Sequence, residues 1–173
     1  MTVHVTHHMK MALAGVACLS TLFAQPAALA ATATATVTVD VISTIRLNNI
    51  TSMVFGDISS SALTGTVVLD PTGTRLSTGG VTINSAVPGS AATFDVSGDP
   101  NTTYTITLPS SITLTNPLGN SMLVDNFNSA PSISGSLDGS GEQVLQVGGT
   151  LNVQSNQIFG SYSGLMSVTV EYN

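Results

Sequence analysis

Apolar and polar residues alternate one by one along both ends of the chain, and no other feature limits the possible folds as strongly. From Gly160 to Tyr172, the even positions hold Gly, Tyr, Met or Val, and the odd positions hold Ser, Thr or Glu, with Leu165 as the exception. Residues 31–41 alternate in the same way between Ala or Val and Thr or Asp. Successive side chains of a β-strand point to opposite faces of a sheet, so both ends are predicted to be extended strands.

The middle of the chain also favours strands. Short alternating runs, separated by turn residues, predict about eight or nine strands, and no window shows the period of a helix. Thr103–Leu108 and Ile112–Thr115 flank Pro109-Ser110-Ser111 and are predicted to form a hairpin, and Gly148-Gly149 is predicted to bulge. Further strands are predicted near 45–55, 66–69, 81–84, 92–96, 122–127 and 143–153, with loops at 70–73, 88–90, 98–101 and 137–141. This spacing indicates an immunoglobulin-like antiparallel β-sandwich, and a small closed barrel is the alternative.

The first 30 residues are typical of a secretory signal peptide. Lys10 precedes an apolar run at 11–24, and the small residues of Ala28-Leu29-Ala30 predict cleavage after Ala30. The run is too short for a membrane anchor, so no membrane span is expected after cleavage. The predicted organisation is a signal peptide at 1–30, an N-terminal strand at 31–42 and a β-sandwich at 43–173. Translation from Met9 and lipid attachment at Cys18 are alternatives for the leader.

Cleavage would remove every His, Cys and Lys from the protein. His4, His7, His8, Lys10 and Cys18 all lie in the leader. The mature chain then lacks a Ser–His or Cys–His nucleophile, the usual zinc and copper ligands and a Schiff-base lysine. The mature chain has two Arg and nine acidic residues, so it lacks the basic surface that nucleic-acid binding requires. We therefore predict no enzyme activity, no cofactor, no metal site and no nucleic-acid partner.

Two pairs of carboxylates could in principle perform glycoside hydrolysis. They are Asp95 with Asp99 and Asp138 with Glu142, and both pairs flank Gly- and Ser-rich turns. Acids at such places are more often turn residues, and the chain has no Trp to stack on a sugar. Asp138-Gly-Ser-Gly-Glu142 could offer oxygen ligands to calcium, but its spacing does not fit an EF-hand loop. Arg46 and Arg75 are interpreted as lone surface or sheet-edge charges.

Several short motifs carry a resemblance to known families. Gly160 stands fourteenth from the end and Tyr172 is penultimate, as in bacterial chaperone–usher pilins. Met53-Val54-Phe55-Gly56-Asp57 resembles an early element of spore coat U-type, archaic pilins. The longer pattern is similar to an exported, pilin-like family, domain of unknown function 4402. Its matching pieces are Ala92–Gly98, Tyr104–Pro109, Val147–Val153 and Asn156–Gly164.

The resemblance implies a subunit that folds with a periplasmic chaperone and assembles through an outer-membrane usher. Its sandwich would lack one strand until an identical or related subunit supplies a donor strand by β-augmentation. The chain lacks the disulfide that many pilins contain, and in this respect it departs from their pattern. The donor side chains are expected to be Ala33, Ala35, Val37, Val39 and Val41, and the acceptor strand is expected to present Gly160, Tyr162, Met166, Val168, Val170 and Tyr172.

The sequence thus predicts an exported structural subunit of a surface fibre, which passes through the periplasm to the cell surface. Two alternatives stay open. Residues 31–42 could be an ordinary first strand that pairs within their own chain. The protein could then be a self-complete, monomeric sandwich that binds a carbohydrate or another component of the cell envelope.

Overall fold

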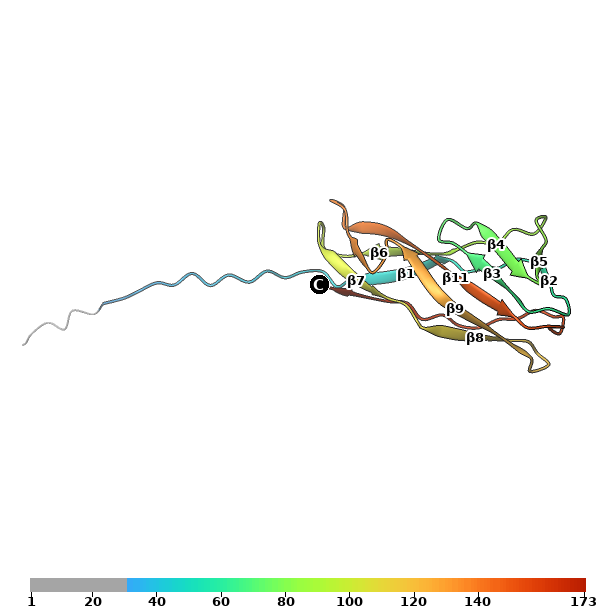
Figure 1. Cartoon of the computed structure of the whole chain (residues 1–173). Coiled ribbons are helices and arrows are strands. Elements are labelled where there is room, and N and C mark those ends of the chain that lie inside the picture. The colour runs from blue at the N-terminus through green and yellow to red at the C-terminus, as the bar shows by residue number, and fades with distance from the viewer. Residues whose placement is uncertain (1–30) are drawn as a thin grey trace, which may run out of the picture. The chain divides into compact units, whose positions relative to one another are not determined.

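The computed structural model describes residues 31–173, and the predicted signal peptide lies outside the described residues. Within 31–173 every regular element is a β-strand, and the sheets are antiparallel (Figure 1). No helix in this part of the chain is long and apolar enough to cross a membrane. The chain divides into two units, up to Val39 and from Asp40 to Asn173. The described residues of the first unit, 31–39, contain no strand.

The largest sheet has seven strands and curls into a half-barrel around β11 (Glu142–Val153). One edge of β11 pairs with β9 (Ser121–Ala130), which pairs in turn with β8 (Ser111–Thr115). The other edge pairs first with β6 (Ala92–Ser97) and then with β3 (Gly65–Leu69). The outer strands are β1 (Arg46–Thr51) beside β6 and β4 (Arg75–Gly79) beside β3.

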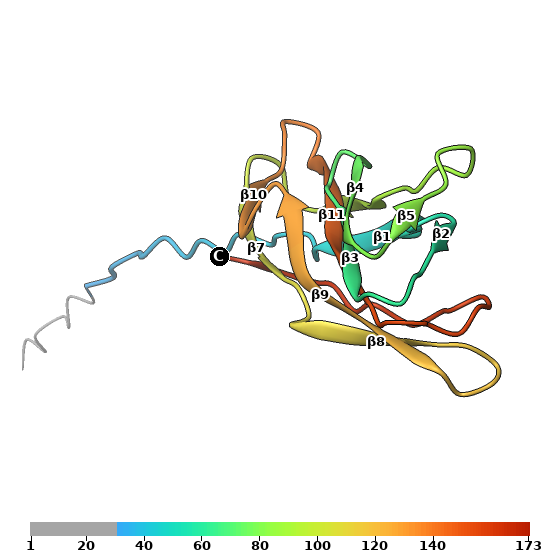
Figure 2. The same cartoon turned by 45° about the vertical axis from the view of Figure 1, so that its right-hand side comes forward.

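Two smaller sheets complete the fold. In one, β7 (Thr103–Thr107) lies between β10 (Ser134–Ser136) and the last strand, β12 (Thr169–Tyr172). The other pairs β2 (Ile58–Ser59) with β5 (Thr82–Ile83). Figure 2 shows the C-terminal segment running beside β8 before it reaches β7. All ladders among the described residues are antiparallel.

The hairpin predicted around Pro109-Ser110-Ser111 is wrong. β7 and β8 belong to different sheets, and the chain crosses from one to the other at these residues. The true hairpin joins β8 to β9 through residues 116–120. Asn116 Oδ1 accepts hydrogen bonds from the amides of Leu118 and Asn120 at 3.0 and 2.8 Å, and Gly119 takes a φ of +84°. Asn and Gly are the residues that such a turn requires, and 109–111 contains neither.

Most of the other local predictions are confirmed. The predicted loops at 70–73, 98–101 and 137–141 are turns, and the irregularity at Gly148-Gly149 appears as a register shift against β9. The predicted strand at 45–55 is shorter, since β1 ends at Thr51 and only Val54 pairs again, with Ser90. The short strands β2, β4 and β10 were not predicted from the sequence.

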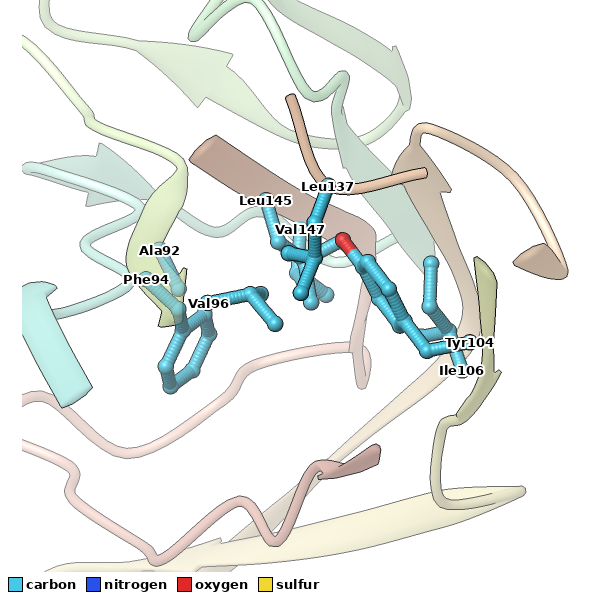
Figure 3. Packing of buried hydrophobic residues seen from close by; sticks show 8 residues of the cluster. All are labelled: Ala92, Phe94, Val96, Tyr104, Ile106, Leu137, Leu145 and Val147. Atoms are coloured by element: carbon cyan, nitrogen blue, oxygen red, sulfur yellow. The ribbon is translucent and has the colours of Figure 1, made fainter. Parts of the chain in front are cut away.

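The core consists of two clusters of buried side chains. One contains Tyr104 and Ile106 of β7 together with residues of β6 and β11, and Figure 3 shows these side chains pointing toward one another. The other is built from β3, β9 and the second half of β11. Tyr104 is fully buried, and burial raises the pKa of its hydroxyl, which donates a hydrogen bond to Gln143 Oε1 at 2.8 Å. The largest fully buried side chain of the domain is therefore uncharged, and its hydroxyl has a hydrogen-bond partner.

Candidate functional site

An open groove of about 880 Å³, with an apolar floor and walls of mixed polarity, lies where the two core clusters meet. One wall is the segment 52–59, and the other is the C-terminal segment 160–166. The floor consists of side chains from β6, β8, β9 and β11: Ala92, Phe94, Ile112, Leu114, Met122, Val124 and Leu151. Asp57 is the only charged residue in the lining. A groove of this kind suits an apolar occupant that brings no charge of its own.

The two groove walls differ in how their backbone is paired. On the wall at 52–59, Val54 pairs with Ser90, β2 pairs with β5, and the Phe55 carbonyl accepts a hydrogen bond from Arg75. β1 pairs only with β6, and β12 pairs only with β7. Between Gly160 and Val168, Ser163 alone makes backbone–backbone hydrogen bonds among the described residues, both with Thr115. Unpaired N–H and C=O groups at an edge are a template for another strand. The groove is therefore bordered on its 160–168 side by backbone that can exchange hydrogen bonds with an inserted chain.

The C-terminal residues lie on the predicted faces, although the predicted strand is too long. Only Thr169–Tyr172 forms a ladder, because 160–168 has no neighbouring strand on its groove side. Side-chain exposure nevertheless alternates as predicted, since Tyr162, Met166, Val168, Val170 and Tyr172 are half-buried and their odd-numbered neighbours are exposed. Gly160, Tyr162 and Met166 line the groove, whereas Val168, Val170 and Tyr172 pack against the first core cluster.

The predicted donor residues are exposed and take no part in any ladder of the structure. Ala33 and Ala35 are exposed, and Val37, Val39 and Val41 are exposed by 91, 82 and 90%. Residues 31–45 contain no strand, so the first strand of the folded domain is β1. Three valines in water on one face of an extended segment leave a large apolar surface without a partner in the described chain.

Arg75 holds one wall of the groove in place, a role that sequence reasoning missed. Its guanidinium donates hydrogen bonds to the carbonyl oxygens of Phe55, Asn84 and Val87 at 2.6, 3.2 and 2.9 Å. The residue lies on β4, an outer strand, so its interpretation as a sheet-edge charge is confirmed, but the half-buried side chain is not a lone surface charge. The planar guanidinium can reach three carbonyls at once, which few other side chains could do. In the sequence, the only local signal for this wall is the glycine that follows Phe55. Gly56 takes a φ of +70°, a special backbone conformation.

The first and last segments of the folded domain meet at Tyr172, which lies outside the groove lining. The Tyr172 hydroxyl accepts a hydrogen bond from the amide of Asp99 and lies beside the carbonyl of Ser43, three residues before β1 begins. The first and last parts of the folded domain are thus tied together. From this corner, β1 leads along the chain to the groove wall at 52–59, and the wall at 160–166 leads to β12.

Of the two carboxylate pairs, Asp138 shows the geometry of a turn residue, whereas Asp95 lies within β6. Asp138 Oδ1 accepts hydrogen bonds from the Ser140 hydroxyl, the Ser140 amide and the Glu142 amide, at 2.6, 2.8 and 3.0 Å. The hydroxyl of Ser140, followed by these amides, lowers the pKa of Asp138. Asp95, Asp138 and Glu142 line a smaller cavity of about 340 Å³, but Asp99 does not. Among residues 31–173, no three His, Cys, Asp or Glu side chains gather in a way that could hold a metal ion.

Comparison with known proteins identifies a family without a known activity. A family model described as "Domain of unknown function (DUF4402)" matches residues 45–172. No curated protein and no solved structure matches the chain. The matched stretch begins one residue before β1 and ends at Tyr172, so it includes both walls of the groove. The chain belongs to the DUF4402 family.

Proposed function

We propose that this protein is an exported structural subunit of a surface fibre, in which each copy inserts its N-terminal segment into the groove of a neighbouring copy. The folded domain is then an immunoglobulin-like sandwich that lacks one strand. The subunit crosses the periplasm, with a chaperone and an outer-membrane usher as proposed partners, and ends at the cell surface. The observation that carries this proposal is the groove with an apolar floor, bordered along 160–168 by backbone that is almost entirely unpaired.

The donor and the groove are complementary in chemistry. Residues 31–41 offer small apolar side chains at every second position and no charge except Asp40, which lies on the opposite face from Val37, Val39 and Val41. The groove offers an apolar floor and, along 160–168, free backbone groups. Alternate side chains would enter the groove, and the backbone would pair with its edges, as in other cases of β-augmentation.

The chain's own N-terminal segment is badly suited to fill its own groove. β1 begins at Arg46, directly after this segment, so an insertion within one chain would require a sharp reversal at residues 42–45. These residues are Ile, Ser, Thr and Ile. They lack Gly, Pro, Asn and Asp, which most often form tight turns, and Ile and Thr favour extended backbone. Insertion into a second copy needs no reversal.

The energy involved is large enough to matter for folding. Burial of the five donor side chains Ala33, Ala35, Val37, Val39 and Val41 would contribute roughly 5–8 kcal/mol, as an upper estimate. That sum is comparable to the stability of a whole domain, which is about 5–15 kcal/mol. A copy with an empty groove should therefore be much less stable than a copy inside a fibre.

Cysteine cross-linking tests the proposal directly, because residues 31–173 contain no Cys. The full chain carrying Val37→Cys and Met166→Cys, exported and oxidised, should give a ladder of covalent multimers on a denaturing gel without reductant. Two further pairs sample the register of the inserted strand: Ala35→Cys and Val39→Cys, each combined with Met166→Cys. Side chains on neighbouring strands lie close enough for a disulfide when their positions are opposite.

The matched control moves one cysteine away from the groove. Leu76 is exposed on β4, so Val37→Cys with Leu76→Cys should leave only monomer. A cross-linked monomer instead of a ladder would support the self-complete sandwich, in which 31–42 pairs within its own chain. Absence of any cross-link in all three groove pairs would contradict a donor role for this segment.

A further inference from the structure

Three loops meet at the end of the folded domain that lies away from the C-terminus, and they expose apolar side chains (Figure 1). The loops cover residues 60–64, 116–120 and 154–160. The Asn156 amide donates a hydrogen bond to the Ser61 carbonyl at 2.7 Å, and Gln157 Nε2 donates one to the Ser121 carbonyl at 3.2 Å. Leu63, Leu118, Ile158 and Phe159 are exposed by 69, 78, 46 and 91%. These four residues are called the apolar tip below.

The two ends of the domain differ in charge. The segments that build the tip end, 58–69, 110–124 and 143–168, contain no acidic or basic residue. The opposite end, around Tyr172, carries four acids, Asp99, Asp138, Glu142 and Glu171, against one base, Arg46, which like Glu142 lies opposite Ser97. Two such acidic ends would repel each other if they met, whereas the uncharged tip can face an acidic end without repulsion.

Charge therefore selects one direction for an inserted strand. A donor that runs antiparallel to 160–172 leaves the groove near Gly160, beside the tip, and places its own domain beyond the tip. A parallel donor leaves near Tyr172 and brings two acidic ends together. Antiparallel pairing is also slightly more stable per residue, and it is the arrangement of every ladder in the described chain.

The short connection between donor and domain then brings the two copies into contact. Ser43 lies against its own domain, where its carbonyl accepts a hydrogen bond from Tyr172. Ile42 alone separates Ser43 from Val41, the last donor side chain. Two steps along a chain span at most about 7 Å. The Tyr172 corner of one copy must therefore lie close to the groove end of the next.

We infer that the apolar tip is a second interaction surface, which docks against the Tyr172 end of the next copy of this chain. This inference rests on the proposed function, because the inserted strand sets the distance and the direction. The tip buries its exposed leucines and Phe159 between consecutive subunits, and it limits bending at each junction. Strand insertion determines which copies are joined, and the tip determines how firmly their domains are held end to end.

The test uses the full chain with Leu118→Ser and Phe159→Ser together. Both side chains are exposed, so the folded domain itself should keep its unfolding midpoint. We expect the multimers of this variant to dissociate on heating at least tenfold faster than those of the unchanged chain, and its fibres to bend more in electron micrographs. Leu76→Ser, an exposed leucine on β4, is the matched control and should change the rate less than twofold.

A second variant adds charge instead of removing apolar area. Leu63→Asp places an acid on the tip opposite the acidic end of the next copy, and it should accelerate dissociation by a similar factor, with a smaller effect in high salt. Equal dissociation rates for the tip variants and the unchanged chain would overturn the tip contact while leaving strand insertion intact. Equal acceleration by Leu76→Ser would also overturn it. If the unchanged chain forms no multimers and its cysteine variants form no cross-links, both the proposed function and the tip contact are contradicted.

Discussion

The hydroxyl group of Tyr172 donates a hydrogen bond to the carbonyl oxygen of Ser43 at 3.1 Å, which joins the last strand to the start of the folded domain. The same oxygen accepts a hydrogen bond from the Asp99 amide at 2.6 Å. Three segments that are distant in sequence therefore meet at one phenol. This corner determines where the N-terminal segment leaves the domain, and hence where a neighbouring copy would be attached.

Replacing Tyr172 with Phe should loosen this corner. The change removes two hydrogen bonds, each of which contributes about 1 kcal/mol, so the free energy of unfolding should fall by roughly 2 kcal/mol. The amide of Asp99 should also exchange its hydrogen faster. Denaturant unfolding and hydrogen exchange measure the two effects, and unchanged values of both would show that the corner is held by packing alone.

Replacing Arg75 with Met should weaken the groove wall. The carbonyls of Phe55, Asn84 and Val87 lose a charged donor, and the free energy of unfolding should fall by about 3 kcal/mol in total. Arg75→Lys should recover only part of the loss, because one ammonium group cannot copy the guanidinium fork.

Arg46→Met is the natural control for Arg75, because Arg46 is the other basic residue of the described chain and its side chain is exposed. It should change the free energy of unfolding by less than about 0.5 kcal/mol. Denaturant unfolding of the three variants, with hydrogen exchange at residues 53–57, distinguishes the wall from the rest of the domain. A similar loss from both arginines would contradict the positioning role of Arg75.

Substitutions at Gly56 and Gly119 distinguish the energetic cost of a strained backbone from the cost of steric crowding. Both have positive φ, +70° and +84°, so an Ala at either place costs about 1–2 kcal/mol for its backbone conformation. At Gly119 the new Cβ meets nothing within 4 Å, whereas at Gly56 it would lie 2.6 Å from the Val87 carbonyl oxygen and against the Arg75 guanidinium. Gly56→Ala should therefore lose a further 1–3 kcal/mol, roughly, in a thermal or denaturant unfolding measurement. Equal losses would mean that the loop at 87–89 moves aside freely.

The turn at 138–142 should open in acid. Hydrogen bonds from the Ser140 hydroxyl and the following amides lower the pKa of Asp138. A carboxyl whose pKa is lowered in the folded state stabilises that state above its usual value of about 3.9, and this contribution is lost as the pH falls through the lower, folded value. Amide exchange of Ser140 should accelerate in that range, below a pH of about 3.9, and stay slow above it. In Asp138→Ala the same amide should exchange fast at every pH, and a flat profile in the unchanged chain would contradict the prediction.

Local chemistry allowed the strands, several turns and the C-terminal face to be predicted. Alternation alone indicates that Tyr162, Met166 and Val168 share a face, because the period of a strand is a property of the backbone. The pairing of β7 with β10 and β12, and of β8 with β9, depends on contacts across the whole fold, so the short Pro-Ser-Ser segment suggests a hairpin that the fold does not contain. The same reason applies to Arg75, whose three acceptors lie in segments that only the folded chain brings together.

The arginine at the groove wall also has a consequence for resistance to proteolysis. Proteases of the trypsin type cut after Lys or Arg, and from Ala31 onward the chain offers them only Arg46 and Arg75. Arg46 lies in a ladder opposite Ser97, and the side chain of Arg75, which such an enzyme must take into its specificity pocket, is already bound to three carbonyls. Of the two sites, only Arg46 therefore presents an exposed side chain to an enzyme of this class.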